Sequence, residues 1–340
     1  MFGTLLNSDT VCNFAQLALE EVLSTTTKMH YAFACTHWCA WMCFFTTLIA
    51  NLLLMVVVRR DSSSSANFQQ FVPVLYASSV TNILVSTFHL ICQPVMILHN
   101  SVLYSPLIGY VPSDYITALV LFDIYGCFII FESILVPLVF IMRFFVVCRR
   151  RQFNLRQIYI AGACGLIISL LGSLSLAYFG IYTENLLKEN CGKFRRIMQD
   201  FTGFEDPIFY IYKTTDIRIK YPITALLLLF YLSFIGTFFL DRYVENYVRA
   251  CQPQNRDSSY ARTLQLSRGF GAAGFVTIVG AILPYSILVI CLVFELNIGV
   301  YGIAIPLGSA FVPTIIPITI FYFNGTYRRA VFKLLLGIRP

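Results

Sequence analysis

Charged residues are scarce in this chain. Only 12% of its 340 residues are Asp, Glu, Lys or Arg, whereas 58% are hydrophobic. An ordinary soluble domain carries roughly 25% charged residues, so the chain lacks the polar surface that a soluble protein of its length needs. The composition excludes most soluble folds, nucleic-acid-binding tails and disordered scaffolds. It favours a protein that crosses a membrane several times.

Motifs of enzymes and metal sites are also absent. The sequence contains no HExxH, GxSxG, P-loop or GxGxxG pattern, and these are the spacings that place a catalytic metal, a nucleophile or a nucleotide phosphate. Its 11 cysteines include no CxxC pair, and its 4 histidines form no cluster of ligand spacing. We therefore predict that the protein is not an enzyme and that it binds no metal or cofactor.

Seven apolar stretches are long enough to cross a bilayer as helices, which takes about 20 residues each. They cover residues 31–58, 69–98, 115–147, 157–182, 221–243, 269–293 and 300–323. They leave an N-terminal segment, residues 1–30, and a tail, residues 324–340, in which Tyr327–Leu336 has the pattern of a short amphipathic helix. The prediction is an all-α membrane protein, a bundle of seven transmembrane helices followed by an amphipathic helix.

The basic residues indicate which end of the chain lies outside. With the N-terminus outside, sixteen of the 24 Lys and Arg residues fall on the cytoplasmic side and eight on the other. Because Lys and Arg accumulate on the cytoplasmic side, an extracellular N-terminus and a cytoplasmic tail are favoured. Seven of the eight outside residues lie between the fourth and fifth spans, against the trend. The net charge of +7 thus reports orientation in the lipid bilayer, and we predict no nucleic-acid partner.

Ionisable side chains within the spans are candidates for function, because an Asp, Lys or Arg there costs at least about 2.5–3.5 kcal/mol. Asp123 and Glu132 lie nine residues apart in the third span, and so on opposite sides of a regular helix. Each either borders a ligand cavity or makes a structural hydrogen bond to a neighbouring helix. His89, in the outer half of the second span, is either a core histidine or a ligand contact.

Arg143 and three prolines are candidates for conformational change. Arg143 lies near the inner end of the third span, just before the basic run 149–151. It either snorkels to the membrane interface or acts as a switch that meets a cytoplasmic partner. Pro284 in the sixth span and Pro313 and Pro317 in the seventh remove backbone hydrogen bonds. They are candidate hinges, although proline is also common in membrane helices.

Small residues recur at every fourth position of the fourth span. The series is Ala161, Gly165, Ser169, Ser173 and Ala177. Small side chains at this spacing let two helix backbones approach closely in lipid. The stripe predicts a helix–helix interface and carries no information about a ligand.

Four short stretches resemble the nematode seven-transmembrane chemoreceptors, the serpentine receptors of the Str/Srd-like type. In chain order they are Asn51 in an Asn-Leu-Leu of the first span; Gln93-Pro94 followed by His99; Phe140 to Phe144 around Arg143; and Pro313 and Pro317 followed ten residues later by Tyr327-Arg328. The likeness extends from about residue 45 to 333. Met142 and Ile316 depart from it, because the family usually has Tyr at the first position and commonly an acid at the second.

The resemblance implies a GPCR-like receptor in the ciliary plasma membrane of a sensory neuron, acting in the sense of smell. It would bind a small environmental odorant or pheromone-like molecule from outside and activate a heterotrimeric G protein. The candidate ligand-binding residues are Asp123, Glu132, His89 and Gln93, and the candidate coupling residues are Arg143, Arg149, Arg150, Tyr327 and Arg328. Because no cysteine lies at the outer end of the third span, Cys12 and Cys191 are a candidate substitute for the disulfide of rhodopsin-like receptors.

Two other classes of protein remain open. An inverted seven-span ligand-gated cation channel, of the kind seen among insect odorant receptors, would have its N-terminus inside the cell. A small membrane transporter often shows repeated halves with matching broken helices, and the sequence shows no such symmetry.

Overall fold

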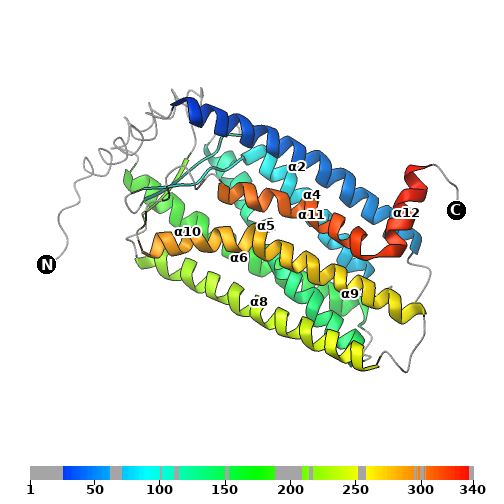
Figure 1. Cartoon of the computed structure of the whole chain (residues 1–340). Helices are drawn as coiled ribbons and strands as arrows, with labels where there is room; N and C mark the ends of the chain where they lie inside the picture. The colour runs from blue at the N-terminus through cyan, green and yellow to red at the C-terminus, as the bar shows by residue number, and fades with distance from the viewer. Residues whose placement is uncertain are drawn as a thin grey trace.

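Long helices lying side by side make up most of the structure, a computed structural model that describes residues 26–61, 71–99, 102–110, 115–149, 153–187, 209–213, 217–251, 258–294 and 304–336, together with residues 296, 298 and 302. In chain order the helices are α2 (Thr26–Asp61), α4 (Val72–Cys92), α5 (Tyr115–Cys148), α6 (Leu155–Leu187), α8 (Ile217–Cys251), α9 (Ser258–Thr277), the π-helical turn η1 (Ile278–Ile282), α10 (Leu283–Val293), α11 (Ala304–Phe323) and α12 (Gly325–Leu335). The segments α9, η1 and α10 follow one another directly and form a single rod (Figure 1).

The predicted seven-helix membrane bundle is confirmed. By length and composition, six helical segments in the described ranges can cross a membrane: α2, α4, α5, α6, the α9–α10 rod and α11. The seventh rod, α8, contains the apolar stretch of the predicted fifth span and lies alongside the others (Figure 1). The amphipathic helix α12 follows α11 and turns away from it (Figure 1). Its Tyr327 is buried whereas Arg328 and Arg329 are exposed.

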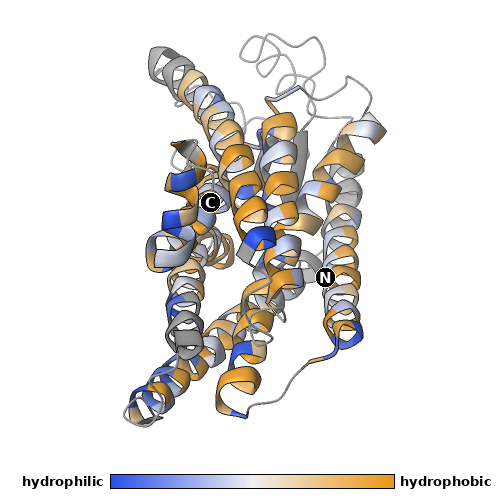
Figure 2. Ribbon diagram, turned by 90° about the vertical axis from the view of Figure 1, so that its right-hand side faces the viewer, coloured by the Kyte–Doolittle hydropathy of each residue, from blue (hydrophilic) through white to orange (hydrophobic). Residues whose placement is uncertain are grey.

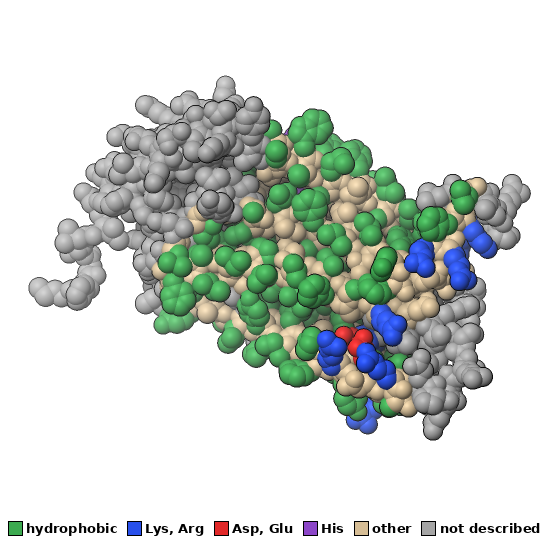
Figure 3. Space-filling model, in the orientation of Figure 1, with side chains coloured by type: hydrophobic (Ala, Val, Ile, Leu, Met, Phe, Trp, Pro, Cys, Tyr) green, Lys and Arg blue, Asp and Glu red, His purple; other side chains and the backbone are tan. Residues whose placement is uncertain are grey.

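The outer surface of the bundle is apolar, as lipid requires. Leu171 on α6 and Phe239 on α8 are 63% and 66% exposed. Figure 2 shows many hydrophobic residues along the long helices. Figure 3 shows hydrophobic side chains over the middle of the molecule, with Lys and Arg gathered toward the end where α12 lies. Exposed apolar surface of this extent marks a contact with membrane or protein, and around membrane-length helices it fits lipid.

A small antiparallel sheet closes the other end of the bundle, and the sequence analysis did not predict it. Its strands are β1 (Ile97–His99), β2 (Val102–Pro106) and β3 (Phe209–Lys213), in the order β1-β2-β3. Leu103 of β2 pairs with Leu98 of β1 and with Tyr212 of β3. The sheet therefore ties the segment after α4 to the segment between α6 and α8. We call this the sheet end and the opposite one the α12 end.

The predicted second span, residues 69–98, is too long, because α4 ends at Cys92. Gln93 adopts a left-handed conformation with φ 39° and ψ 61°. The following Pro94 disfavours the α conformation at residue 93 and has no N–H to continue a helix. Close packing holds the turn, since a Cβ on Gly109 would lie 2.1 Å from the carbonyl oxygen of Ile91. Residues 97–98 accordingly belong to β1.

The other helix bounds differ mainly at the α12 end. Helix α8 continues to Cys251 and α9 begins at Ser258, both beyond the predicted spans 221–243 and 269–293. Glu245 lies 3.8 Å from Arg242 and 3.6 Å from Arg249, and ion pairs at these spacings stabilise a helix in water. Helix α11 begins at Ala304 rather than at residue 300.

The small-residue stripe of α6 packs against α5, as predicted. A Cβ on Gly165 would lie 3.3 Å from Ile134 and 3.4 Å from Phe131, so neither helix leaves room for a larger side chain there. Ser169 and Ser173 are buried in the same interface. This contact fixes the position of α5 relative to α6 and thereby the wall of the cavity described below.

Candidate functional site

A cavity of about 250 Å³ lies in the half of the bundle nearer the sheet. Its walls come from α5, α6, α8, η1 and α10, and residues of β2 cover it. Most of the lining is apolar, including Leu103, Phe122, Ile130 and Leu288. A concave, largely apolar pocket with a few polar groups is the usual form of a small-molecule site.

Asp123 is the carboxylate on the cavity wall. Its Oδ1 accepts a hydrogen bond of 2.6 Å from the Ser173 hydroxyl, which also lies 2.5 Å from the Asp123 carbonyl oxygen. Ser173 belongs to the small-residue stripe of α6 and also lines the cavity. The stripe therefore positions the carboxylate as well as packing two helices.

The other three predicted ligand residues are not among the lining residues. His89 is buried, and its Nδ1 lies 2.8 Å from the hydroxyl of Tyr125, which does line the cavity. Gln93 is fully buried; its Oε1 lies 3.1 Å from Nδ1 of His37, and its Nε2 donates to the carbonyl of Leu90. Gln93 thus connects α2 to the end of α4, and His89 connects α4 to α5.

Glu132 lies deeper in the bundle. It is 7% exposed, and among the described residues its Oε1 has no hydrogen-bond partner. An unpaired buried acceptor costs about 1–3 kcal/mol. Packing alone does not explain such a side chain, and an ionisable residue within a span is a candidate for function.

A second polar cluster, which the sequence analysis did not identify, joins three spans near the middle of the bundle. Asn51 of α2 donates to the carbonyl oxygens of Thr47, at 2.9 Å, and Pro313, at 3.2 Å. Asn82 of α4 donates to Asn51 Oδ1 at 3.1 Å, and the hydroxyls of Thr47 and Thr314 lie 2.7 Å apart. Asn82 and Thr314 are buried. Their occurrence as polar residues within apolar stretches was the only sequence feature that could have indicated this cluster.

Pro284 and Pro313 have different local effects. Pro284 lies two residues after the end of the π-helical turn η1, and in a regular helix its ring would clash with the carbonyl four residues back, which belongs to Gly280. The extra residue of a π turn relieves such a clash. Helix α11 stays continuous across Pro313 and Pro317, and Asn51 uses the Pro313 carbonyl. Pro284 is thus the candidate hinge with an observed irregularity.

Two glycines allow the sixth and seventh spans to touch at this turn. A Cβ on Gly280 would lie 2.5 Å from Val312, and one on Gly308 would lie 2.7 Å from the Gly280 carbonyl oxygen. Larger residues would force the two helices apart. The irregular turn is therefore held directly against α11.

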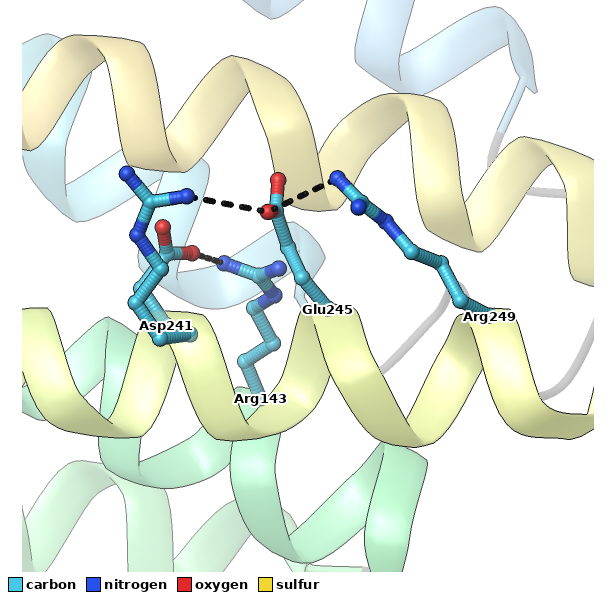
Figure 4. A network of polar contacts seen from close by, with 5 residues as sticks. Arg143, Asp241, Glu245 and Arg249 are labelled. Atoms are coloured by element: carbon cyan, nitrogen blue, oxygen red, sulfur yellow. Dashed lines mark hydrogen bonds and ion pairs between the residues drawn. The ribbon is translucent and has the colours of Figure 1, made fainter.

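An ion pair joins the third and fifth spans near the α12 end. Arg143 Nη1 lies 2.5 Å from Asp241 Oδ1, and Figure 4 shows the two side chains pointing toward one another from α5 and α8. Arg143 is 1% exposed, so it does not snorkel to the interface. Its Nε and Nη2 are buried and have no partner in the described part of the chain. A Cβ on Gly271 of α9 would lie 3.4 Å from Asp241, so the sixth span packs on the pair.

The remaining predicted coupling residues occupy different surroundings. Arg149 lies over the ring of Phe144, with 5.9 Å between the guanidinium carbon and the ring centre. Tyr327 is fully buried in the core cluster at the α12 end, and Arg328 beside it is exposed. Arg150 and the candidate disulfide residues Cys12 and Cys191 lie outside the described residues. Sequence reasoning missed Asp241, which has no motif of its own.

A comparison of the whole sequence with protein families identifies this architecture. The model of the family described as serpentine type 7TM GPCR chemoreceptor Srd matches residues 36–333. The chain belongs to the Srd family. Its resemblance to the Str/Srd-like receptors is thereby confirmed, and its family is one of receptors rather than enzymes. No curated protein matches the chain.

Proposed function

We propose that this Srd-family chemoreceptor binds a small environmental molecule in the cavity and activates a heterotrimeric G protein at its α12 end. The N-terminus and the sheet then face the outside of a sensory-cell membrane, and the receptor serves the sense of smell. The observation that carries the proposal is the Arg143–Asp241 pair, because it joins two of the helices that form the cavity.

A ligand in the cavity can act on this pair through the helices. The cavity is bounded by α5 and α8, and the same two helices carry Arg143 and Asp241. A ligand that fits one arrangement of α5 and α8 better than another shifts the population toward it. In the arrangement described here the pair is formed. We therefore assign this arrangement to the resting receptor.

The irregular sixth span supports the same mechanism. Ala281 and Ile282 of η1 and Tyr285 just after Pro284 all line the cavity. A π turn is rare, and where one occurs it frequently lies at a functional site. A ligand in contact with these side chains would therefore press on the least regular point of the rod, and about two turns before that point the rod packs on Asp241 through Gly271.

The unpaired nitrogens of Arg143 provide the coupling chemistry. Once Asp241 is released, the guanidinium presents several donors to carbonyl or carboxylate groups of a partner. Arg328 and Arg329 lie exposed on α12, and Figure 3 shows Lys and Arg gathered at this end of the molecule. Arg149, Tyr327 and Arg150, the last of which lies outside the described residues, remain coupling residues in our proposal.

Blocking the cavity tests the proposal. Cells expressing the receptor and a G-protein reporter are exposed to a panel of volatile odorants, and we expect at least one to raise the signal. Ala177 lines the cavity, so Ala177→Phe should abolish that response. Ala161 belongs to the same stripe of α6 but is not a lining residue, so Ala161→Phe is the matched control. A response that survives Ala177→Phe would place the ligand elsewhere, and ligand-evoked current without a reporter signal would favour the channel.

A further inference from the structure

The polar groups on the cavity wall bear on which ligand the receptor takes. Among the described lining residues there is one carboxylate, Asp123, and there is no Lys, Arg or His. The rest of the lining is apolar, or carries hydroxyl groups. A site of this composition offers negative charge to a ligand and no positive charge.

Asp123 has capacity for a further partner. In the described part of the chain its side chain accepts one hydrogen bond, from Ser173, and it has no ion pair. A carboxylate has about four acceptor sites. Asp123 lies eight residues after Tyr115, the first residue of α5, or about 12 Å along the helix axis. Asp123 is half-buried in a largely apolar wall, where water screens its charge less than at a fully exposed site, so a matching cation is attracted more strongly.

We propose that the cavity selects small apolar amines and that their protonated nitrogen pairs with Asp123. This inference rests on the proposed function, since it names the chemical class of ligand for the same cavity. The ammonium donates to the carboxylate while the hydrocarbon body lies against Phe122, Ile130 and Leu288. A carboxylic acid would instead bring like charges together. An alcohol would gain only a weaker hydrogen bond.

Ser105 supplies a second polar contact on the cover of the cavity. It lies on β2, is 1% exposed and lines the cavity, and its hydroxyl has no hydrogen-bond partner among the described residues. Buried hydroxyls are normally paired. An ammonium has three donors, so a bound amine can use Ser105 as an acceptor in addition to Asp123.

The volume limits the size of the amine. About 250 Å³ equals roughly eight water molecules at about 30 Å³ each. This holds a ligand of roughly ten non-hydrogen atoms, below the usual range for drug-sized ligands. A phenylethyl or hexyl group with one amine is of this size.

The test uses matched probes and purified full-length receptor. Hexyl, cyclohexylmethyl and phenylethyl groups are each presented as the amine, the alcohol, the hydrocarbon and the carboxylic acid. Binding is measured as the rise in Tm of the receptor in detergent, which needs no G protein. We expect an amine to bind at least tenfold more tightly than the alcohol of the same shape. Asp123→Asn should lower amine affinity roughly 10- to 100-fold and leave the alcohol nearly unchanged.

Two serine variants on one face of α6 distinguish an effect on the ligand site from an effect on helix packing. Ser173→Ala removes the donor that orients Asp123 and should weaken the preference for amines. Ser169→Ala, one turn away, removes a hydroxyl that, among the described residues, bonds only to the Gly165 carbonyl and does not line the cavity. The preference should survive that change. If Asp123→Asn fails to fold, Asp123→Glu and Ser173→Ala still measure the preference.

The outcomes distinguish this inference from the proposed function. Alcohols or acids binding as tightly as amines, a preference unchanged by Asp123→Asn, or no shift with any amine would each overturn the inference. An odorant response in the G-protein reporter would meanwhile leave the proposed function intact. Conversely, amine binding that depends on Asp123, without any reporter signal, would support the inference and count against coupling to a G protein.

Discussion

Neutralising Asp241 should activate the receptor without a ligand. Removing one member of a buried ion pair costs about 3–5 kcal/mol. Asp241 is 23% exposed, and an Asn side chain could still accept a hydrogen bond from Arg143, so we reduce the loss in Asp241→Asn to about 2 kcal/mol. That shifts the equilibrium roughly 30-fold toward the arrangement without the pair. If about 1% of receptors are active at rest, about a quarter become active.

The assay is ligand-independent signalling in a G-protein reporter, normalised to the amount of receptor at the cell surface. Glu245→Gln is the control, because it also removes one negative charge from α8. Its contacts with Arg242 and Arg249 are long and involve exposed partners, worth about 0.3–0.5 kcal/mol. Basal signalling should therefore rise strongly in Asp241→Asn and hardly in Glu245→Gln. Equal basal signalling in Asp241→Asn and the unchanged receptor would refute the assignment of the pair to the resting state.

Three further predictions follow from the packing and the charge pattern. Gly280→Ala should lower the Tm of the purified receptor by the equivalent of about 1–3 kcal/mol through overpacking, whereas Gly236→Ala, with open space around its Cβ position, should not. Asn51→Leu should cost about 1–3 kcal/mol, because it leaves the Asn82 amide and the Pro313 carbonyl without their partner; a Tm equal to that of the unchanged receptor would contradict the role of this cluster. A tag at the N-terminus should be reached by antibody on intact cells and a tag at the C-terminus only after permeabilisation; the reverse result would favour the inverted channel.

The helices could be predicted from the sequence because their signal is local. A run of about 20 apolar residues is sufficient evidence for a span. The four-residue spacing of the small side chains in α6 is likewise sufficient to indicate a helix–helix contact. The π turn is partly predictable in the same way, since Pro284 requires a disturbance at the preceding turn. The form of this disturbance depends on the contact of Gly280 with Gly308, which lies between two helices and so leaves no local signal in the sequence.

The features that were missed depend on contacts between distant residues. Asp241 and Arg143 are 98 residues apart, and β3 pairs with β2 across more than a hundred residues of chain. Short strands with no alternating pattern give no local signal. The sequence analysis grouped Asp123, His89 and Glu132, which are ionisable residues in the predicted spans, with Gln93, which belongs to a stretch that resembles the family. Only the packing shows that Asp123 lines the cavity while the others do not.

Replacing Glu132 tests whether this side chain lowers the stability of the bundle and is needed for signalling. Its buried Oε1 has no hydrogen-bond partner among the described residues, so replacing the side chain by Leu, of similar volume, should stabilise the receptor. We expect Glu132→Leu to raise the Tm by about 1–2 °C per kcal/mol gained, from a gain of about 1–3 kcal/mol. Thr277→Val should do the opposite, because the Thr277 hydroxyl already donates to the Ala273 carbonyl. A higher Tm with reduced signalling would mean that Glu132 is retained for the change of state. A lower Tm would mean that Glu132 stabilises the bundle, against our reading of its burial.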